Sequence, residues 1–228
     1  MTTRGHAAGY GTGVARRHLV WDWNGTLLDD LSVVVAATNA ALASAGGGPV
    51  TAPEHRRHFR RPIVDYYAQV LGRPVDEAEF ARLDKLFHDA YQAMLPGCRL
   101  TADAREAVAA WGAPQSLLSM WHHADLVPTV DRFGLTGHFV RVDGLRVRLG
   151  GGVAHKAPYL SRHLAAQRLE PATVVVIGDT VDDAHAAAAV GARCVLYSGG
   201  FTDPAQLRAT GVPVVDTLLE AVDLARRL

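Results

Sequence analysis

Short apolar runs alternate with longer segments of helical periodicity along most of the chain. Runs rich in β-branched and other apolar side chains, bounded by turn residues, are typical of buried strands. Six such runs occur, at residues 18–22, 115–119, 138–142, 173–179, 193–197 and 212–216. Most are followed by helix-like segments, such as 182–191 and 217–228. Strands that alternate with helices predict a parallel sheet covered by helices on both faces.

The interval between the first two predicted strands is much longer than one crossover helix requires, and it has helical periodicity throughout. Helices are predicted in 31–46, in 52–72 with an interruption at Pro62, and in 75–95. A further helix, about 103–111, leads back to the second strand. The sequence therefore predicts a helical module, 31–95, inserted after the first strand.

Composition limits the classes of partner. The chain has 228 residues, with 23 Lys plus Arg and 23 Asp plus Glu, so no net basic field favours nucleic acid or an anionic membrane. No apolar run approaches the roughly 20 residues that span a bilayer. Cys98 and Cys194 lack the spacing of a metal site and suit a reducing compartment. Residues 1–17 lack the apolar segment of a signal peptide and are predicted to be a flexible tail. We expect a cytoplasmic protein.

Polar residues with chemical potential follow several predicted strands. Ligands of parallel sheets gather at the carboxyl ends of the strands, so these residues are expected to converge. The candidates are Asp22 with Asn24, Gly25 and Thr26, then Ser119, then Lys156, and finally Asp179 with Asp182 and Asp183. Each of them alone is also compatible with a turn, a helix cap or a solvated side chain. Their order and spacing along the chain, rather than any single residue, indicate a shared site.

Four motifs in this order resemble those of the haloacid dehalogenase-like (HAD) hydrolase superfamily. They are the strand followed by "DWNGT" at Asp22, the strand "QSLLS" that ends at Ser119, Lys156 ahead of a helix, and the strand that ends in Gly178 and Asp179 with Asp183 after it. In particular, the chain resembles the phosphoglycolate phosphatase-like members, which have a helical cap inserted after the first motif. This resemblance implies an α/β fold with a Rossmann-like parallel sheet core, 18–30 and 96–228, and an inserted α-helical cap domain, 31–95.

The resemblance also implies a chemistry: Mg²⁺-dependent hydrolysis of a small phosphate ester, with Asp22 forming an aspartyl-phosphate. The implied metal ligands are the carboxylates of Asp22, Asp179 and Asp183 and the backbone carbonyl of Asn24. Lys156 would offset the negative charge beside Asp22. The substrate phosphate would be held by Ser119, Met120, Gly25 and Thr26. The implied partner is a small phosphorylated metabolite.

Asn24 departs from the pattern of these phosphatases, in which an Asp at this position protonates the leaving oxygen and then activates water. An amide cannot exchange a proton in this way, and losing a positioned acid/base group typically slows a reaction roughly 10²- to 10⁴-fold. Several explanations are open. The leaving group needs little protonation, or His122 or His123 supplies the proton, or Asn24–Gly25 deamidates to restore Asp. Alternatively, the protein binds a phosphate or metabolite with little turnover.

Two related chemistries fit the sequence less well. Haloacid dehalogenases also lack the second carboxylate, but they dispense with Mg²⁺ and lack the paired Asp of "GDTVDD". Phosphonatases resemble the Asp-Trp-x-Gly-Thr pattern, but they need a Schiff-base lysine early in the cap. The inserted module contains only Lys85, far from its start.

The inserted module is expected to select the substrate. Its segment 55–62 concentrates arginines, and Arg60 or Arg61 can bind a carboxylate or a second phosphate bidentately, which would suit phosphoglycolate-like anions. The alternative interpretation is that these arginines form a solvated basic face of a helix. Asp29 and Asp30 are predicted to form the hinge into the module and to cap its first helix.

Overall fold

A parallel sheet forms the core of the protein in the computed structural model, which describes residues 17–146 and 155–228. Its six strands are hydrogen-bonded in the order β5-β4-β1-β6-β7-β8, and every neighbouring pair is parallel. The strands are β1 (His18–Trp21), β4 (Gln115–His122), β5 (Val142–Leu145), β6 (Val174–Gly178), β7 (Arg193–Tyr197) and β8 (Val214–Val215). The predicted tail, 1–17, lies outside the described residues except for Arg17.

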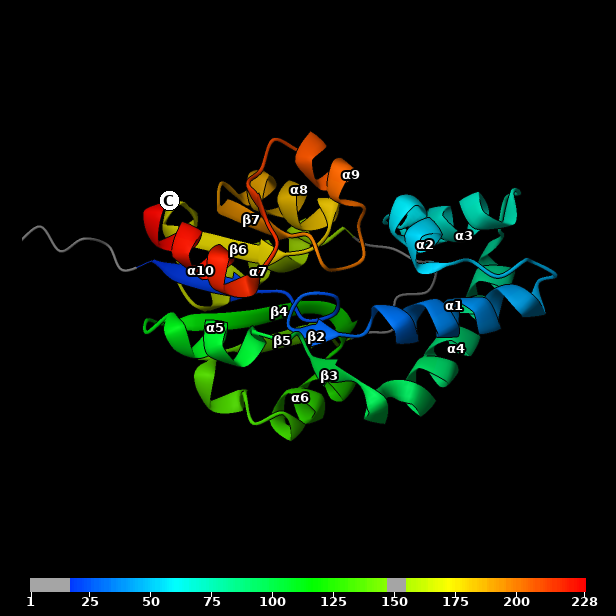
Figure 1. Ribbon diagram of the computed structural model, residues 1–228, viewed down its shortest axis with the longest axis horizontal. Coiled ribbons are helices and arrows are strands. Elements are labelled where there is room, and N and C mark those ends of the chain that lie inside the picture. The colour runs from blue at the N-terminus through cyan, green and yellow to red at the C-terminus, as the bar shows by residue number, and fades with distance from the viewer. Residues whose placement is uncertain (1–16, 147–154) are drawn as a thin grey trace, which may run out of the picture.

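Helices cover both faces of this sheet (Figure 1). The face that carries Leu19 and Trp21 packs against α5 (Ala104–Ala110), α6 (His123–Arg132) and α10 (Leu218–Arg227). The face that carries Val20 packs against α7 (Ala157–Ala166), α8 (Val181–Val190) and α9 (Pro204–Ala209). Short 3₁₀ turns complete the core at Leu95–Gly97, Thr136–His138 and Pro171–Thr173. The α/β class with a Rossmann-like parallel sheet is therefore confirmed.

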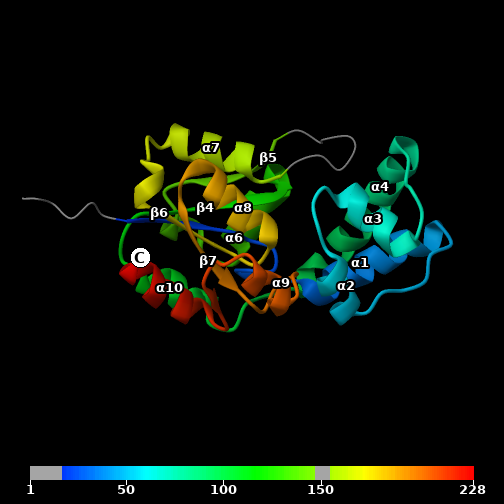
Figure 2. The same ribbon diagram turned by 90° about the horizontal axis from the view of Figure 1, so that it is seen from above.

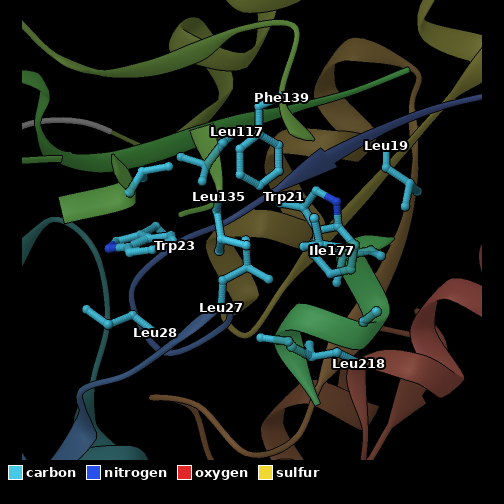
Figure 3. Packing of buried hydrophobic residues seen from close by; sticks show 14 of the residues in the cluster. Leu19, Trp21, Trp23, Leu27, Leu28, Leu117, Leu135, Phe139, Ile177 and Leu218 are labelled. Carbon is cyan, nitrogen blue, oxygen red and sulfur yellow. The ribbon is translucent and has the colours of Figure 1, made fainter. Parts of the chain in front are cut away.

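The apolar core is densest where β1 lies between its two neighbours. Figure 3 shows side chains from β1, β4 and β6, among them Trp21, Leu117 and Ile177, in one cluster with Phe139. Trp23 and Leu27, from the loop after β1, extend this cluster and are fully buried. Burying a side chain of this size stabilises the fold by about 1.5–3 kcal/mol. The loop after β1 is thereby anchored on both sides of its polar residues.

Four helices lie between the two short strands β2 (Leu28–Asp29) and β3 (Arg99–Leu100), which pair antiparallel where the chain leaves and re-enters the core. They are α1 (Leu31–Ser44), α2 (Ala52–His58), α3 (Ile63–Leu71) and α4 (Glu77–Met94). Both ribbon views place them together at one end of the molecule, beyond the sheet (Figures 1 and 2). The helices pack around a small cluster of their own that includes Leu42, Tyr67 and Phe80.

Some predicted elements differ from the structure. The prediction of a strand at 138–142 is wrong, because β5 begins at Val142 and His138 ends a 3₁₀ turn. Of the apolar residues that suggested a strand, Phe139 is buried in the core, whereas Val140 is 66% exposed. The second strand also continues beyond Ser119 to His122. Within the described ranges, no helix has the length and apolar character needed to span a membrane.

Candidate active site

The site lies at the carboxyl ends of β1, β4 and β6. The chain runs from β1 to β4 on one side and later returns to β6 on the other, so β1 marks the point where strand order reverses. Crevices at such points are the usual ligand sites of open parallel sheets. Asp22 follows the last residue of β1, and its N–H donates to the Ile177 carbonyl oxygen at 2.8 Å. This bond continues the parallel ladder and fixes where the Asp22 side chain begins.

Three buried carboxylates meet at this edge. Oxygen atoms of Asp22, Asp179 and Asp183 all lie within 4.8 Å of one another. The Lys156 ammonium lies between two of them, 2.7 Å from Asp22 Oδ1 and 2.6 Å from Asp183 Oδ1. Asp179 accepts hydrogen bonds from Thr26 Oγ1 and from the Phe201 N–H, both at 2.7 Å.

The charges of this cluster are not balanced by the protein. Burial raises the pKa of Asp22 to about 6, although Lys156 opposes the shift. Burial, followed by the nearby Asp22 and Asp183 carboxylates, raises the pKa of Asp179 well above its usual value. Burial also acts on Asp183, but Lys156 and hydrogen bonds from Thr180 hold the pKa of Asp183 below its usual value. Three carboxylates with one ammonium form an oxygen-rich, electron-rich donor set that fits a hard divalent cation.

Small residues allow these groups to approach the backbone. Gly25 has φ +73°, and a Cβ atom there would lie 2.5 Å from Asp179 Oδ2. A Cβ atom on Gly178 would lie 2.3 Å from Asp183 Cγ. Both glycines of the first and fourth motifs are therefore required by close packing against the carboxylates, and at Gly25 by a left-handed backbone as well.

Helix starts orient Lys156 and Asp183. Lys156 is the residue before α7, and its backbone N–H donates to Asp182 Oδ2 at 2.8 Å. Asp183 is in the first turn of α8, where it forms a capping box with Thr180. The Thr180 N–H and hydroxyl donate to Asp183 Oδ2 at 3.0 and 2.6 Å, which leaves Oδ1 for Lys156.

Asn24 is held by a network that the sequence did not reveal. Its amide Nδ2 donates to Asp30 Oδ2 at 2.8 Å and to the Tyr91 hydroxyl oxygen at 2.9 Å. Its Oδ1 accepts from Ser119 Oγ at 3.1 Å. The Tyr91 hydroxyl and the Gly25 N–H also donate to Asp30, at 2.6 and 2.8 Å. The side-chain amide therefore has one fixed orientation.

The prediction that Asp30 caps the first helix of the module is wrong. Asp30 precedes α1, but its side chain makes no capping hydrogen bond. It is fully buried, and burial raises its pKa to about 6 while hydrogen bonds from Tyr91 and Asn24 oppose the shift. An Asp side chain at position 24 would face this carboxylate, whereas an amide donates to it. Asp30 thus gives a structural reason for the amide.

A cavity of about 190 Å³ opens beside the cluster, between the core and the helices of the module. Of the predicted site residues, those that line it are Asp22, Asn24, Ser119, Met120, Lys156, Asp182, Asp183 and Arg61. Gly25, Thr26 and Asp179 are not among its lining residues. Arg60 instead lines a neighbouring hollow, and its Nε donates to the His58 carbonyl oxygen.

The two histidines considered as proton donors have different positions. His122 lines the cavity, stacks on His88 with ring centroids 4.9 Å apart, and lies 3.7 Å from Asp125. His123 begins α6, and its Nδ1 accepts from the Gly144 N–H at 3.2 Å. Of the two, His122 is the one placed to approach a ligand.

Comparisons with known proteins agree with the motifs. A family model described as HAD-hydrolase-like matches residues 154–221. A phosphoglycolate phosphatase from Mesorhizobium japonicum is 27% identical over 212 residues, which cover 83% of this chain and 86% of that protein. A phosphoglycolate phosphatase from Synechococcus elongatus is 27% identical over 197 residues, which cover 84% and 88%.

Solved structures share the fold at low sequence identity. A structure described as a predicted phosphatase from Clostridium acetobutylicum superposes with a TM-score of 0.80 at 14% identity and covers 93% of this chain and 99% of its own. One described as a predicted phosphoglycolate phosphatase from Haemophilus somnus has a TM-score of 0.71 at 18% identity, with coverages of 92% and 97%.

The six-stranded parallel sheet with helices on both faces gives the protein a Rossmann-like α/β fold. The family model and the curated relatives confirm the resemblance that the four motifs predicted. The chain is therefore similar to HAD-like hydrolases, and the curated relatives that it resembles are phosphoglycolate phosphatases.

Proposed function

We propose that the protein is a Mg²⁺-dependent phosphatase that hydrolyses a small phosphate monoester through an aspartyl-phosphate on Asp22. The observation that carries the proposal is the cluster of three buried carboxylates with Lys156 at the cavity wall. A phosphate ester and a carboxylate nucleophile repel each other, so attack requires cations between them. The cluster combines three carboxylates with one ammonium group, so a bound cation would offset the excess negative charge.

The donor set of the cluster fits Mg²⁺, which prefers oxygen ligands. The carboxylates of Asp22, Asp179 and Asp183 would hold the ion together with the backbone carbonyl of Asn24. When bound, Mg²⁺ supplies positive charge that neutralises the phosphate and the nucleophile. The Thr26 and Phe201 donors already fix Asp179 for this role.

Asp22, Lys156 and Ser119 have separate roles in the proposed reaction. Asp22 attacks phosphorus, the bond from phosphorus to the leaving oxygen breaks, and water then hydrolyses the aspartyl-phosphate to release phosphate. Lys156 keeps Asp22 oriented and ionised, because its ammonium contacts both Asp22 and Asp183. Ser119, which lines the cavity and is a hydroxyl donor, can bind a phosphate oxygen in exchange for Asn24 Oδ1.

Asn24 limits which esters react quickly. Its amide cannot protonate a leaving oxygen, so we expect slow turnover of esters with poor leaving groups, by roughly 10²- to 10⁴-fold. The network through Asp30 and Tyr91 supports a stable amide at this position rather than a precursor of Asp, since the amide donates both hydrogens. His122 remains the candidate for a substitute proton donor.

The test is hydrolysis of p-nitrophenyl phosphate, acetyl phosphate, phosphoglycolate and sugar phosphates with Mg²⁺ or with EDTA. The intact Asn24 is verified by mass spectrometry. We expect turnover that EDTA abolishes and that is fastest with the aryl and acyl phosphates. Ordinary rates with phosphoglycolate would instead assign the proton to another group, and His122→Asn would then be compared with His123→Asn. Absence of turnover with every ester would favour a protein that binds phosphate or a metabolite.

Variants at Asn24 test the acid/base argument. Asn24→Asp is made together with Asp30→Asn, so that an amide still faces a carboxylate. We expect this double variant to hydrolyse sugar phosphates faster than the native protein while its Mg²⁺ affinity is unchanged. An unchanged ratio between sugar-phosphate and p-nitrophenyl phosphate turnover would show that the native protein does not lack a proton donor.

A further inference from the structure

Aromatic rings form the wall of the cavity that faces the site from the inserted helices. Phe59, Tyr66, Tyr67, Phe80 and Phe87 all line it from this side. The rings support one another: the centroids of Tyr66 and Tyr67 are 5.8 Å apart, and those of Tyr67 and Phe80 are 6.1 Å apart. Rings fixed in this way present flat apolar surface at little entropic cost when a ligand binds.

Phe201 and Trp121 add rings from the core side of the cavity, and Tyr91 adds another from α4. Phe201 contacts Phe59 at a centroid distance of 5.5 Å, and Trp121 packs edge-on against Tyr91 at 5.5 Å. Tyr91 in turn stacks on Phe87 at 5.8 Å. Phe201, Trp121 and Tyr91 line the same cavity. A group that extends from a phosphate at Asp22 toward the module therefore meets aromatic surface from both parts of the chain.

Positive charge is scarce on these walls. Among the described residues that line the cavity, the lysine and arginine side chains are those of Lys156 and Arg61. Lys156 contacts two carboxylates, and Arg61 Nε lies 3.8 Å from Asp182 Oδ2. A second anionic group on a substrate would find cations that already have acidic partners.

Two further titratable groups of the wall, His55 and Asp84, do not favour a second anion either. Burial lowers the pKa of His55 to about 4, so this ring is neutral at pH 7. Asp84 also lines the cavity, and its charge contributes to the raised pKa of Tyr67. A carboxylate on the leaving group would therefore be repelled by Asp84 and would lose its hydration.

We propose that the leaving group of the substrate is an uncharged, flat, unsaturated ring, so that the substrate is a phosphate monoester of a phenol-like alcohol. This inference rests on the proposed phosphatase function. Asp22 displaces the ring oxygen from phosphorus, the electron pair of the broken bond leaves with that oxygen, and water supplies its proton. A phenol has a pKa of about 10, as tyrosine does, and so departs without an acid from the protein. The aromatic walls and the amide at Asn24 thus select the same class of ester.

The first measurement compares binding of two non-hydrolysable probes to the native protein with Mg²⁺ by calorimetry. Phenylphosphonate carries the ring, and phosphonoacetate carries a carboxylate in its place. Burying a ring of this size corresponds to a roughly 10- to 100-fold gain in affinity, so we expect phenylphosphonate to bind tighter by that factor. Equal or tighter binding of phosphonoacetate would overturn the inference.

A matched pair of variants on α4 locates the ring. Phe87 lines the cavity, whereas the adjacent Leu86 is exposed and lies outside it. Phe87→Leu keeps most of the volume but removes the flat face, and we expect it to weaken phenylphosphonate binding about 5-fold or more while inorganic phosphate binding stays unchanged. Leu86→Ala should alter neither. Equal weakening of both ligands by Phe87→Leu, or the same change in Leu86→Ala, would contradict the assignment.

Turnover of phenyl phosphate and phosphoglycolate, measured alongside binding, separates this inference from the proposed function. Metal-dependent turnover with a preference for phosphoglycolate would leave the phosphatase function intact and overturn the ring preference. Preferential binding of phenylphosphonate without turnover of either ester would uphold the ring preference and overturn the phosphatase function. Failure of both probes to bind would overturn both.

Discussion

Replacing Asn24 by Asp alone should destabilise the protein at neutral pH. The Asn24 amide donates to Asp30 Oδ2 at 2.8 Å and to the Tyr91 oxygen at 2.9 Å, and both bonds are lost. The new carboxylate would face the buried Asp30 carboxylate. Two like charges about 4 Å apart repel by about 4 kcal/mol at an effective dielectric constant of 20. Loss of the amide hydrogen bond to a charged partner adds about 1.5–3 kcal/mol.

The pH dependence of this effect has a definite sign. Burial already raises the pKa of Asp30 to about 6, and a second carboxylate raises the pKa of the pair further. The folded protein then holds protons that the unfolded chain releases near pH 4, so stability falls as pH rises through the folded pKa. The deficit of Asn24→Asp should be small at pH 5 and large at pH 8.

The assay is thermal unfolding at pH 5 and pH 8 in EDTA, with native protein, Asn24→Asp, Asp30→Asn and the double variant. For a chain of this size each kcal/mol shifts Tm by roughly 2–4 °C, so Asn24→Asp should melt about 10–30 °C lower at pH 8. The double variant, which reverses the amide and the carboxylate, should recover most of the loss. A single variant as stable as the native protein at pH 8, or a double variant no better than the single one, would refute the reasoning.

Two further predictions concern other parts of the core. Gly25→Ala should lower Tm and abolish turnover, because its Cβ atom would lie 2.5 Å from Asp179 Oδ2; Gly46→Ala, with the same φ of +73° and no atom within 4 Å, should cost only about 1–2 kcal/mol. Equal Tm shifts in the two variants would contradict this account. Burial, aided by a neighbouring histidine, lowers the pKa of His18 to about 4, so its contribution to stability is complete above pH 6.5 and is lost as pH falls toward 4. Urea unfolding should show a loss of about 2 kcal/mol between pH 6.5 and 5 that is reduced in His18→Gln, and an identical pH slope in that variant would exclude His18 as its source.

The arrangement of the core follows from local patterns that a sequence can show. Asp22 and Asp179 each follow a short apolar run, and parallel strands bring such positions to one edge. The strand prediction for 138–142 failed for a local reason. Phe139 of this segment packs in the core without being part of a strand, and the strand β5 lies further on and contains Asp143 and Gly144. A short apolar run does not by itself distinguish a strand from another buried segment.

The hydrogen-bond network around Asn24 could not be predicted, because it joins residues that are far apart in the sequence and share no motif. Asp30 is six residues from Asn24 and looked like a helix cap, but Tyr91 comes from the far end of α4 and closes the network over it. The aromatic wall likewise joins residues of α3 and α4 that are far apart in the sequence. The available signal was Asp30, an acidic residue directly before the first helix. A carboxylate that is buried at this position needs hydrogen-bond donors from nearby side chains.

Asp22 as the nucleophile is the central claim, and trapping its phosphoryl group tests it most directly. Native protein turning over p-nitrophenyl phosphate with Mg²⁺ is quenched in acid, reduced with borohydride and digested, and the peptides are identified by mass spectrometry. The account predicts modification of Asp22 in the native protein, no modification of Asp29 or Asp30 on the same peptide, and no turnover by Asp22→Asn. Turnover that persists in Asp22→Asn, or a phosphoryl group trapped on another residue, would contradict it.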